Sequence, residues 1–122
     1  MAYAWWNLAL RFALELTAVA GFAVAGWRLT PAPWHWVIAI ALPLVAMALW
    51  GTFAVPDDPS RSGGAPVPVT GFIRLVLELI ILFGGAFALV LSGYREAGIA
   101  LAVLTVLHYA ISVERIIWLI GR

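Results

Sequence analysis

Four long apolar runs alternate with short polar stretches along the chain. They cover roughly residues 5–28, 34–55, 71–92 and 97–120. A helix needs about 20 predominantly apolar residues, at about 1.5 Å per residue, to cross the hydrocarbon core of a bilayer. Each run is long enough, so the pattern predicts an all-α integral membrane protein with four transmembrane helices.

The stretches between the runs contain residues that end helices. Pro31 and Pro33 follow the first run, and proline cannot continue a helix because it lacks a backbone N–H. Residues 56–68 are rich in proline, glycine and serine, which is typical of a flexible loop, and residues 92–96 predict a tight turn. Pro43 lies inside the second run, where it predicts a kink.

An Arg-x-x-x-Glu motif occurs twice in similar apolar surroundings. Arg11 and Glu15 lie in the first run, and Arg74 and Glu78 lie in the third. Side chains four residues apart share one face of a helix, so each pair lies on one stripe. The two copies are separated by 63 residues (74 minus 11, and 78 minus 15). This spacing indicates that a hairpin of two helices is a repeating unit.

The chain is accordingly interpreted as a single membrane domain over residues 1–122. One hairpin repeat covers 5–55, a loop covers 56–70, and the second repeat covers 71–120. Two spans return the chain to its starting side, so both repeats run in the same direction, related by a pseudo-two-fold axis along the membrane normal. Small residues would let the first and third helices approach closely. These residues are Gly21, Ala25, Gly84, Gly85 and Ala88.

Composition supports the membrane class. Hydrophobic residues make up 65% of the chain and charged residues 11%, against roughly 45–50% and about 25% in ordinary soluble domains. Tryptophan and tyrosine gather at both ends of the predicted spans, as they do at membrane–water interfaces. The face that holds both chain ends, called the terminal face, has Trp5, Trp6, Trp50 and Trp118; the opposite, far face has Trp27, Trp34, Trp36 and Tyr94.

Net charge, cysteine content and histidine content limit the kinds of partner and cofactor that we expect. The net charge is +1 without a basic run, so we expect no nucleic-acid partner. There is no cysteine, and His35 and His108 are too few and too scattered for a metal site, so we expect no metal and no cofactor. The expected partner is the lipid bilayer. A bundle of four spans is thin, which is compatible with a homodimer.

Arginine placement predicts the orientation. Lys and Arg near span ends are enriched on the cytoplasmic side. The far face has Arg28 and Arg95, whereas the terminal face has Arg61 and Arg122, with Arg11, Arg74 and Arg115 close to it. Both termini are therefore expected in the cytoplasm.

The fourth run adds polar side chains level with the two motifs. Its inward stripe, at spacings i, i+3, i+7 and i+10, consists of Thr105, His108, Ser112 and Arg115. Glu114 lies about 100° away from that stripe. Asn7 and Thr70 each precede the arginine of a motif by four residues, which adds one polar group to each of those helices.

Formal charges within the spans balance. Three arginines stand against three glutamates: Arg11, Arg74 and Arg115 against Glu15, Glu78 and Glu114. Balance is expected because an unpaired charge at the bilayer centre costs about 2.5–3.5 kcal/mol on insertion scales. Asp57 and Asp58 are interpreted as part of a solvated loop, and Tyr109 as a residue of the lipid interface.

These motifs resemble the YrdB-like family of small bacterial membrane proteins, whose function is unknown. The resemblance implies a four-span protein of the bacterial inner membrane and supplies no activity to carry over. It covers nearly the whole chain. The segments that carry it are Asn7 to Leu16, Leu49 to Pro56, Arg74 to Leu79, and His108-Tyr109-Ala110 with Glu114-Arg115.

The leading functional hypothesis is a membrane-embedded pocket for a small lipophilic molecule, with acid–base chemistry such as epoxide opening or cyclisation. Carboxylates near arginines can activate water while a protonated partner acts as general acid. Glu15 and Glu78 are the candidate acid–base pair, with His108 auxiliary. The candidate ligand-binding residues are Arg11, Arg74, Arg115, Asn7 and Ser112.

Three alternatives stay open at this point. The charges can be structural, locking the helices together by ion pairs alone. A buried glutamate can also serve a proton-coupled transporter or a channel-like assembly. Finally, the chain can be an accessory subunit of a larger membrane partner.

Overall fold

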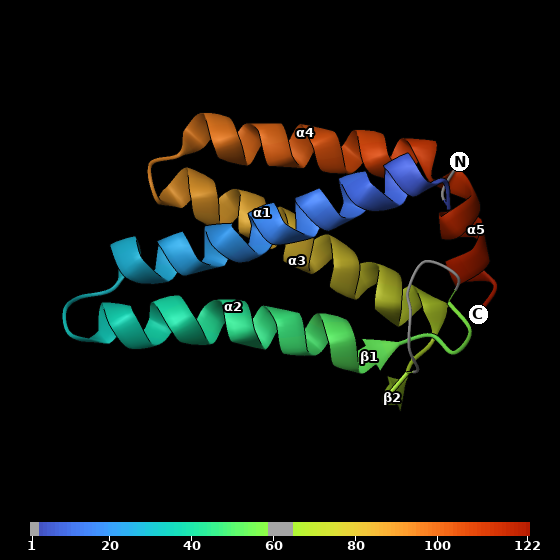
Figure 1. The fold of residues 1–122 in the computed structure, drawn as a ribbon, viewed down its shortest axis with the longest axis horizontal. Helices are drawn as coiled ribbons and strands as arrows, with labels where there is room; N and C mark the ends of the chain where they lie inside the picture. Colours follow the sequence, from blue (N-terminus) through green and yellow to red (C-terminus); the bar gives the residue numbers. More distant parts are fainter. Residues whose placement is uncertain (1–2, 59–64) are drawn as a thin grey trace.

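The computed structural model describes residues 3–58 and 65–122. This part of the chain is predominantly helical, which confirms the all-α class (Figure 1). Its elements are α1 (Trp5–Leu29), α2 (Trp34–Thr52), β1 (Phe53–Ala54), β2 (Val67–Pro68), α3 (Gly71–Leu91), α4 (Arg95–Ile111) and α5 (Val113–Ile120).

Helices α1 to α4 run along the long axis of an elongated bundle. The α1–α2 and α3–α4 connections lie at one end, and the two chain ends lie at the other (Figure 1). Helix α1 packs against α2 and α3, and α3 packs against α1 and α4, whereas α2 and α3 touch only slightly. Helices α1 and α3 therefore form the centre, and α2 and α4 flank it.

Three helices, α1, α2 and α3, are each long and apolar enough to cross a membrane. Helices α4 and α5 meet that test only as a pair, bent by 73° at the break between them. The predicted fourth span over 97–120 therefore consists of two helices that meet at a bend. The break is at Ser112, whose side chain is drawn to another helix: the amide of Asn7 donates to Ser112 Oγ at 2.7 Å.

Helix α5 packs across the start of α3. Gly71 begins α3, and a Cβ at this position would lie 1.6 Å from the carbonyl oxygen of Leu119. Only glycine allows this approach, so the sequence at the start of α3 fixes where α5 rests.

Close contact between α1 and α3 also depends on glycine. A Cβ at Gly21 would lie 2.7 Å from the carbonyl oxygen of Gly85, and one at Gly85 would lie 2.5 Å from the Cα of Ala18. The expected small-residue interface between the first and third helices is present at these positions.

The connection between the hairpins has some regular structure. Helix α2 continues through Pro43 and ends at Thr52, three residues before the predicted end of the span. Strands β1 and β2 then pair in parallel, with Phe53 opposite Val67. The centre of the predicted loop, residues 59–64 with Arg61, lies outside the described residues.

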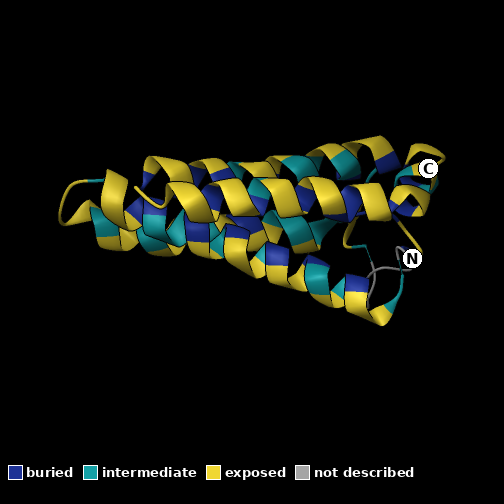
Figure 2. Cartoon of the chain, turned by 90° about the horizontal axis from the view of Figure 1, so that it is seen from above, coloured by how far each residue is buried: buried dark blue, intermediate teal, exposed yellow. Residues whose placement is uncertain are grey.

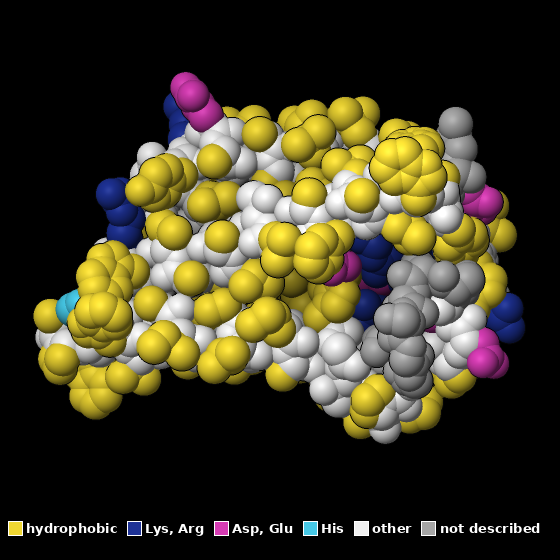
Figure 3. Space-filling model, in the orientation of Figure 1, with side chains coloured by type: hydrophobic (Ala, Val, Ile, Leu, Met, Phe, Trp, Pro, Cys, Tyr) yellow, Lys and Arg dark blue, Asp and Glu magenta, His cyan; other side chains and the backbone are white. Residues whose placement is uncertain are grey.

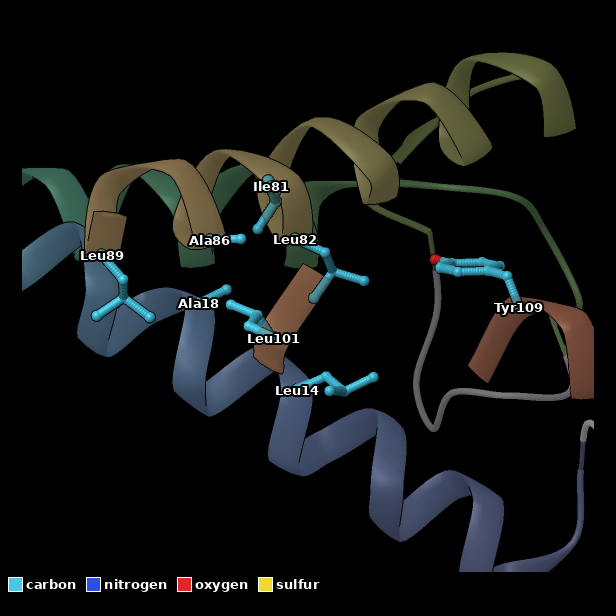
Figure 4. Close-up of a cluster of buried hydrophobic side chains, with 8 residues drawn as sticks. All are labelled: Leu14, Ala18, Ile81, Leu82, Ala86, Leu89, Leu101 and Tyr109. Atoms are coloured by element: carbon cyan, nitrogen blue, oxygen red, sulfur yellow. The ribbon is translucent and has the colours of Figure 1, made fainter. Parts of the chain in front are cut away.

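Most of the side chains on the face of the bundle in Figure 3 are hydrophobic, and much of the helix surface in Figure 2 is exposed. The buried residues, in contrast, include many polar and charged side chains. Large exposed side chains such as Phe12, Ile40, Phe87 and Val106 cover the sides. The buried hydrophobic cluster is small, and Tyr109 lies apart from its aliphatic side chains (Figure 4). Apolar sides around a polar centre suit a lipid surrounding. The members of the cluster are Leu14, Ala18, Ile81, Leu82, Ala86, Leu89, Leu101 and Tyr109.

Candidate functional site

Glu78 lies at the centre of the buried charges and has no exposed surface. Its Oε1 accepts hydrogen bonds from Arg11 Nη2 at 2.5 Å, from Arg74 Nε at 3.1 Å and from Arg115 Nη2. Its Oε2 accepts from the hydroxyl of Tyr109 at 2.8 Å. We call Glu78 and these arginines the three-arginine centre. Both carboxylate oxygens are engaged, so Glu78 offers little to an outside molecule.

Arg74 and Arg11 both contact residues at the C-terminal end of α2. Arg74 Nη1 donates to the carbonyls of Trp50 and Phe53, at 2.5 and 2.7 Å. These carbonyls lie at the C-terminal end of α2, where backbone acceptors have no partner within the helix. Arg11 and Arg74 also lie over the Trp50 ring, 5.4 and 4.8 Å from its centroid, in cation–π contact. Trp50, predicted as a residue of the membrane interface, thus contacts two arginines of the three-arginine centre.

Asp58 supplies the third negative charge that balances the buried arginines, a charge that the sequence analysis assigned to Glu114. It is only 6% exposed, and its two oxygens accept from Arg115 Nη1 and Nη2 at 2.7 and 3.0 Å. The prediction of a solvated Asp58 is therefore wrong, because a bidentate pair with Arg115 draws it inward. Glu114, counted in the predicted balance, is exposed on α5.

The signal for Asp58 was present in the sequence. Glu114 lies off the inward stripe, which leaves Arg115 one acid short, and Asp58 follows α2 at the terminal face. The balanced set in the structure consists of Arg11, Arg74 and Arg115 with Glu15, Glu78 and Asp58.

His108 and its partners form a second polar group beside the centre. Asn7 Oδ1 lies 3.0 Å from His108 Nδ1, and Asn7 Nδ2 donates to Ser112 Oγ at 2.7 Å. With the amide in this orientation, Nδ1 donates to Asn7 Oδ1. All three side chains are buried.

The remaining members of the predicted site have local partners. Thr105 is buried and donates to the carbonyl of Leu101 in its own helix at 2.7 Å. Thr70 caps α3, accepting from the backbone N–H of Ile73 at 3.4 Å. Tyr109, predicted at the lipid interface, is instead buried and bonded to Glu78, so that prediction is wrong. Tyr109 lies four residues after Thr105 and so on the same side of α4, and this spacing is the signal that could have indicated its burial.

Four polar atoms are buried without a hydrogen-bond partner in the described part of the chain. Three of the atoms belong to buried polar residues described above, and the fourth belongs to Tyr3. The atoms are Arg11 Nη1, Arg115 Nε, His108 Nε2 and the Tyr3 hydroxyl oxygen. Buried polar atoms without partners are uncommon in folded proteins and often mark places where water or a ligand binds.

Glu15 has surroundings unlike those of Glu78. Its side chain is 23% exposed, and its one hydrogen bond among the described residues comes from Arg11 Nε to Oε1, at 3.2 Å. It lines a pocket of about 170 Å³ between α1, α2 and α3, called the side pocket. Figure 3 shows acidic and basic side chains inside a hollow between α1 and α2. The other lining residues are Phe12, Leu16, Val19, Ala46, Met47, Trp50, Gly51 and Ile81.

Metal binding has no candidate group of ligands within residues 3–58 and 65–122. No three His, Asp or Glu side chains there gather closely enough to hold an ion. The acids of the cluster are instead engaged by guanidinium groups.

Comparison with known proteins identifies the family but no activity. Residues 9–106 match the family described as "Protein of unknown function (DUF2568)". The chain is 41% identical to "Uncharacterized protein YrdB" of Bacillus subtilis (strain 168) over 116 residues, which cover 95% of this chain and 94% of that protein. No solved structure matches. The chain therefore belongs to the DUF2568 family of proteins of unknown function and is a relative of the uncharacterized YrdB.

Proposed function

We propose that this chain is a multi-pass protein of the bacterial inner membrane that binds a small lipophilic molecule in the side pocket. The observation that supports this is Glu15, a half-buried carboxylate in the wall of an apolar pocket on the side of the bundle. A molecule dissolved in the bilayer would reach such a pocket without crossing the polar headgroup region.

The proposed topology has four spans, with α4 and α5 together forming the last. Each hairpin is one repeat, related to the other by a pseudo-two-fold axis along the membrane normal, and both termini are cytoplasmic. The central position of α1 and α3, each with one Arg-x-x-x-Glu motif, supports this arrangement.

The two motifs have separate roles in this proposal. The three-arginine centre is structural, because it joins α1, α3 and α5 through a carboxylate that has no exposed surface. Glu15 serves the ligand, because its second oxygen has no partner among the described residues. Any acid–base chemistry on the ligand would then depend on Glu15, not on a pair formed with Glu78.

A second candidate is a purely structural or accessory subunit. The sealed state of the three-arginine centre favours it, since every acid of the cluster is paired with an arginine. The two candidates differ in the role of the side pocket. A binding protein holds a ligand there, whereas an accessory subunit does not require one.

A photolabelling experiment separates them. The protein is reconstituted in phosphatidylcholine vesicles and irradiated with a neutral phenyl-diazirine reagent, and the labelled residues are mapped by mass spectrometry. Binding in the side pocket predicts labels concentrated on Phe12, Leu16 and Met47 above outward residues such as Ile40 and Phe87. Uniform labelling of all exposed apolar residues would contradict the proposal.

A pocket-filling variant supplies the control. Gly51 lines the side pocket, and a Cβ there meets no atom of the described residues within 4 Å, so Gly51→Leu extends into the pocket without a clash against their backbone. We expect it to abolish the concentrated labelling. The matched variant Val45→Phe enlarges an exposed residue of the same helix outside the pocket and should leave the labelling unchanged.

A further inference from the structure

The geometry points to a defined ligand class for the side pocket: a lipophilic molecule whose head is a single neutral ring bearing a hydroxyl group that donates to Glu15. This inference rests on the proposed binding function and adds what the pocket selects. Size, hydrogen bonding, charge and wall chemistry each contribute one part of it.

The volume limits the head to one ring. The side pocket holds about 170 Å³, and a dry apolar cavity of about 150 Å³ in another protein accommodates benzene. A whole lipid does not fit, so the tail of the molecule must lie outside, along the apolar surfaces of α1 and α2. The exposed side chains of Phe12, Leu16 and Met47 continue that apolar surface outward.

Hydrogen bonding calls for a donor on the ligand. Glu15 is the one charged side chain among the residues that line the side pocket. Its Oε1 accepts from Arg11, and Oε2 has no partner in the described ranges. A carboxylate oxygen accepts hydrogen bonds and cannot donate them when ionised, and a bond to a charged acceptor is stronger than one between neutral groups. A hydroxyl group therefore complements this wall, whereas an ether does not.

Charge neutrality calls for an uncharged head. The arginines Arg11, Arg74 and Arg115 are already balanced by Glu15, Glu78 and Asp58. An ammonium head would reach Glu15 but would leave the buried set with an extra positive charge, and an anionic head would face Glu15 directly. Extra charge inside a membrane protein is costly because lipid cannot solvate it.

The walls suit an aromatic ring. Phe12 and Trp50 present aromatic surfaces to the side pocket, and Met47 presents a polarisable thioether. Aromatic rings pack favourably against other rings and against methionine sulfur. Together the four features describe a phenol-like head on an alkyl tail.

The test compares three probes that share one tail: 4-octylphenol, its methyl ether 4-octylanisole, and 4-octylphenyltrimethylammonium. Each competes against phenyl-diazirine labelling of the side pocket in phosphatidylcholine vesicles. We expect 4-octylphenol to compete at a concentration at least about tenfold lower than the ether, because a hydrogen bond to a charged group is worth that factor or more. The ammonium probe should compete less well than the phenol.

Substitutions assign the preference to Glu15. Glu15→Leu should erase the difference between phenol and ether, and Glu15→Gln, which keeps an amide oxygen, should retain part of it. Each ratio is taken against the wild-type protein in the same vesicles, so that partitioning of the probes into lipid cancels. The control Glu96→Gln removes an exposed carboxylate on α4 outside the pocket and should leave the ratio unchanged.

The outcomes that overturn the inference are distinct. Equal competition by phenol and ether in the wild-type protein contradicts the proposed hydrogen bond from a ligand hydroxyl group to Glu15, while the pocket itself remains a binding site. Stronger competition by the ammonium probe contradicts the neutral head. If neither neutral probe competes, the proposed function fails, and this inference fails with it.

Discussion

Among the residues that the structure describes, Glu78 accepts four hydrogen bonds, from three arginines and a tyrosine, whereas Glu15 accepts one. The two residues have the same motif around them, and the motif predicts a pair on one helix face in both cases. The difference comes from residues far away in the sequence. Tyr109 and Arg115 reach Glu78 only, because α4 and α5 pack against α3. No local pattern around Glu15 or Glu78 contains that information.

The first prediction compares the two carboxylates. Glu78→Gln leaves three buried guanidinium groups with one acid fewer, so we expect it to destabilise the protein by about 3–5 kcal/mol, the usual effect of breaking a buried pair. Glu15→Gln removes a partly exposed bond and should cost about 1 kcal/mol or less. Reversible unfolding in mixed micelles measures both. Similar losses for the two variants would mean that Glu78 is not the central residue.

The second prediction concerns Asp58, which the sequence interpretation placed in solvent. Asp58→Asn weakens the bidentate pair with Arg115 and should lower stability by about 3 kcal/mol. Asp57→Asn is the matched control, since Asp57 is exposed and asparagine tolerates its positive φ of 63°. It should change stability by less than about 0.5 kcal/mol. Equal effects of the two changes would contradict the buried position of Asp58.

At the scale of elements, apolar run length predicted α1, α2 and α3 to within a few residues, because lipid demands long uninterrupted apolar helices. It could not predict the break between α4 and α5. Two tertiary contacts accompany the break, Asn7 with Ser112 and Gly71 with Leu119, and neither can be read from the local sequence. The predicted inward stripe of Thr105, His108, Ser112 and Arg115 is nevertheless buried in full. Periodicity therefore indicated the buried side of these helices better than their shape.

The third prediction tests the packing of α5 against Gly71 at the start of α3. Gly71→Ala places a Cβ against the backbone of Leu119, so α5 must move away, and we expect a loss of about 1–3 kcal/mol. Gly51→Ala adds a Cβ that meets no atom of the described residues within 4 Å, and because alanine suits a helix better than glycine, the change should be neutral or stabilising by up to about 1 kcal/mol. Unfolding in micelles compares the pair. Equal tolerance of both changes would show that α5 does not rest on Gly71.

At the scale of the molecule, an apolar exterior surrounds a charge-neutral polar interior near the end that holds both termini (Figures 1 and 3). This distribution is what a membrane protein needs, because lipid solvates apolar side chains and neither charge nor bare backbone. Three charged residues at the far end, Arg28, Arg95 and Glu96, lie beside the connection between α3 and α4.

The fourth prediction concerns orientation. The chain has no cysteine, so single cysteines can be introduced at Ala32 in the α1–α2 connection and at the C-terminal Arg122. In intact bacterial cells, a membrane-impermeant maleimide should label the first variant and not the second, because the proposed topology puts the termini in the cytoplasm. The reverse pattern would invert the topology without altering the site.

The central claim is that Glu15 is open to lipid while Glu78 is sealed, and a hydrophobic carbodiimide tests it most directly. The reagent partitions into the bilayer and forms adducts with the carboxyl groups it can reach. The protein in phosphatidylcholine vesicles is treated with dicyclohexylcarbodiimide, and the adducts are mapped by mass spectrometry. We predict an adduct at Glu15, reduced by Gly51→Leu, and none at Glu78 until the protein is unfolded. An adduct at Glu78 in the folded protein, or none at Glu15, would contradict the account.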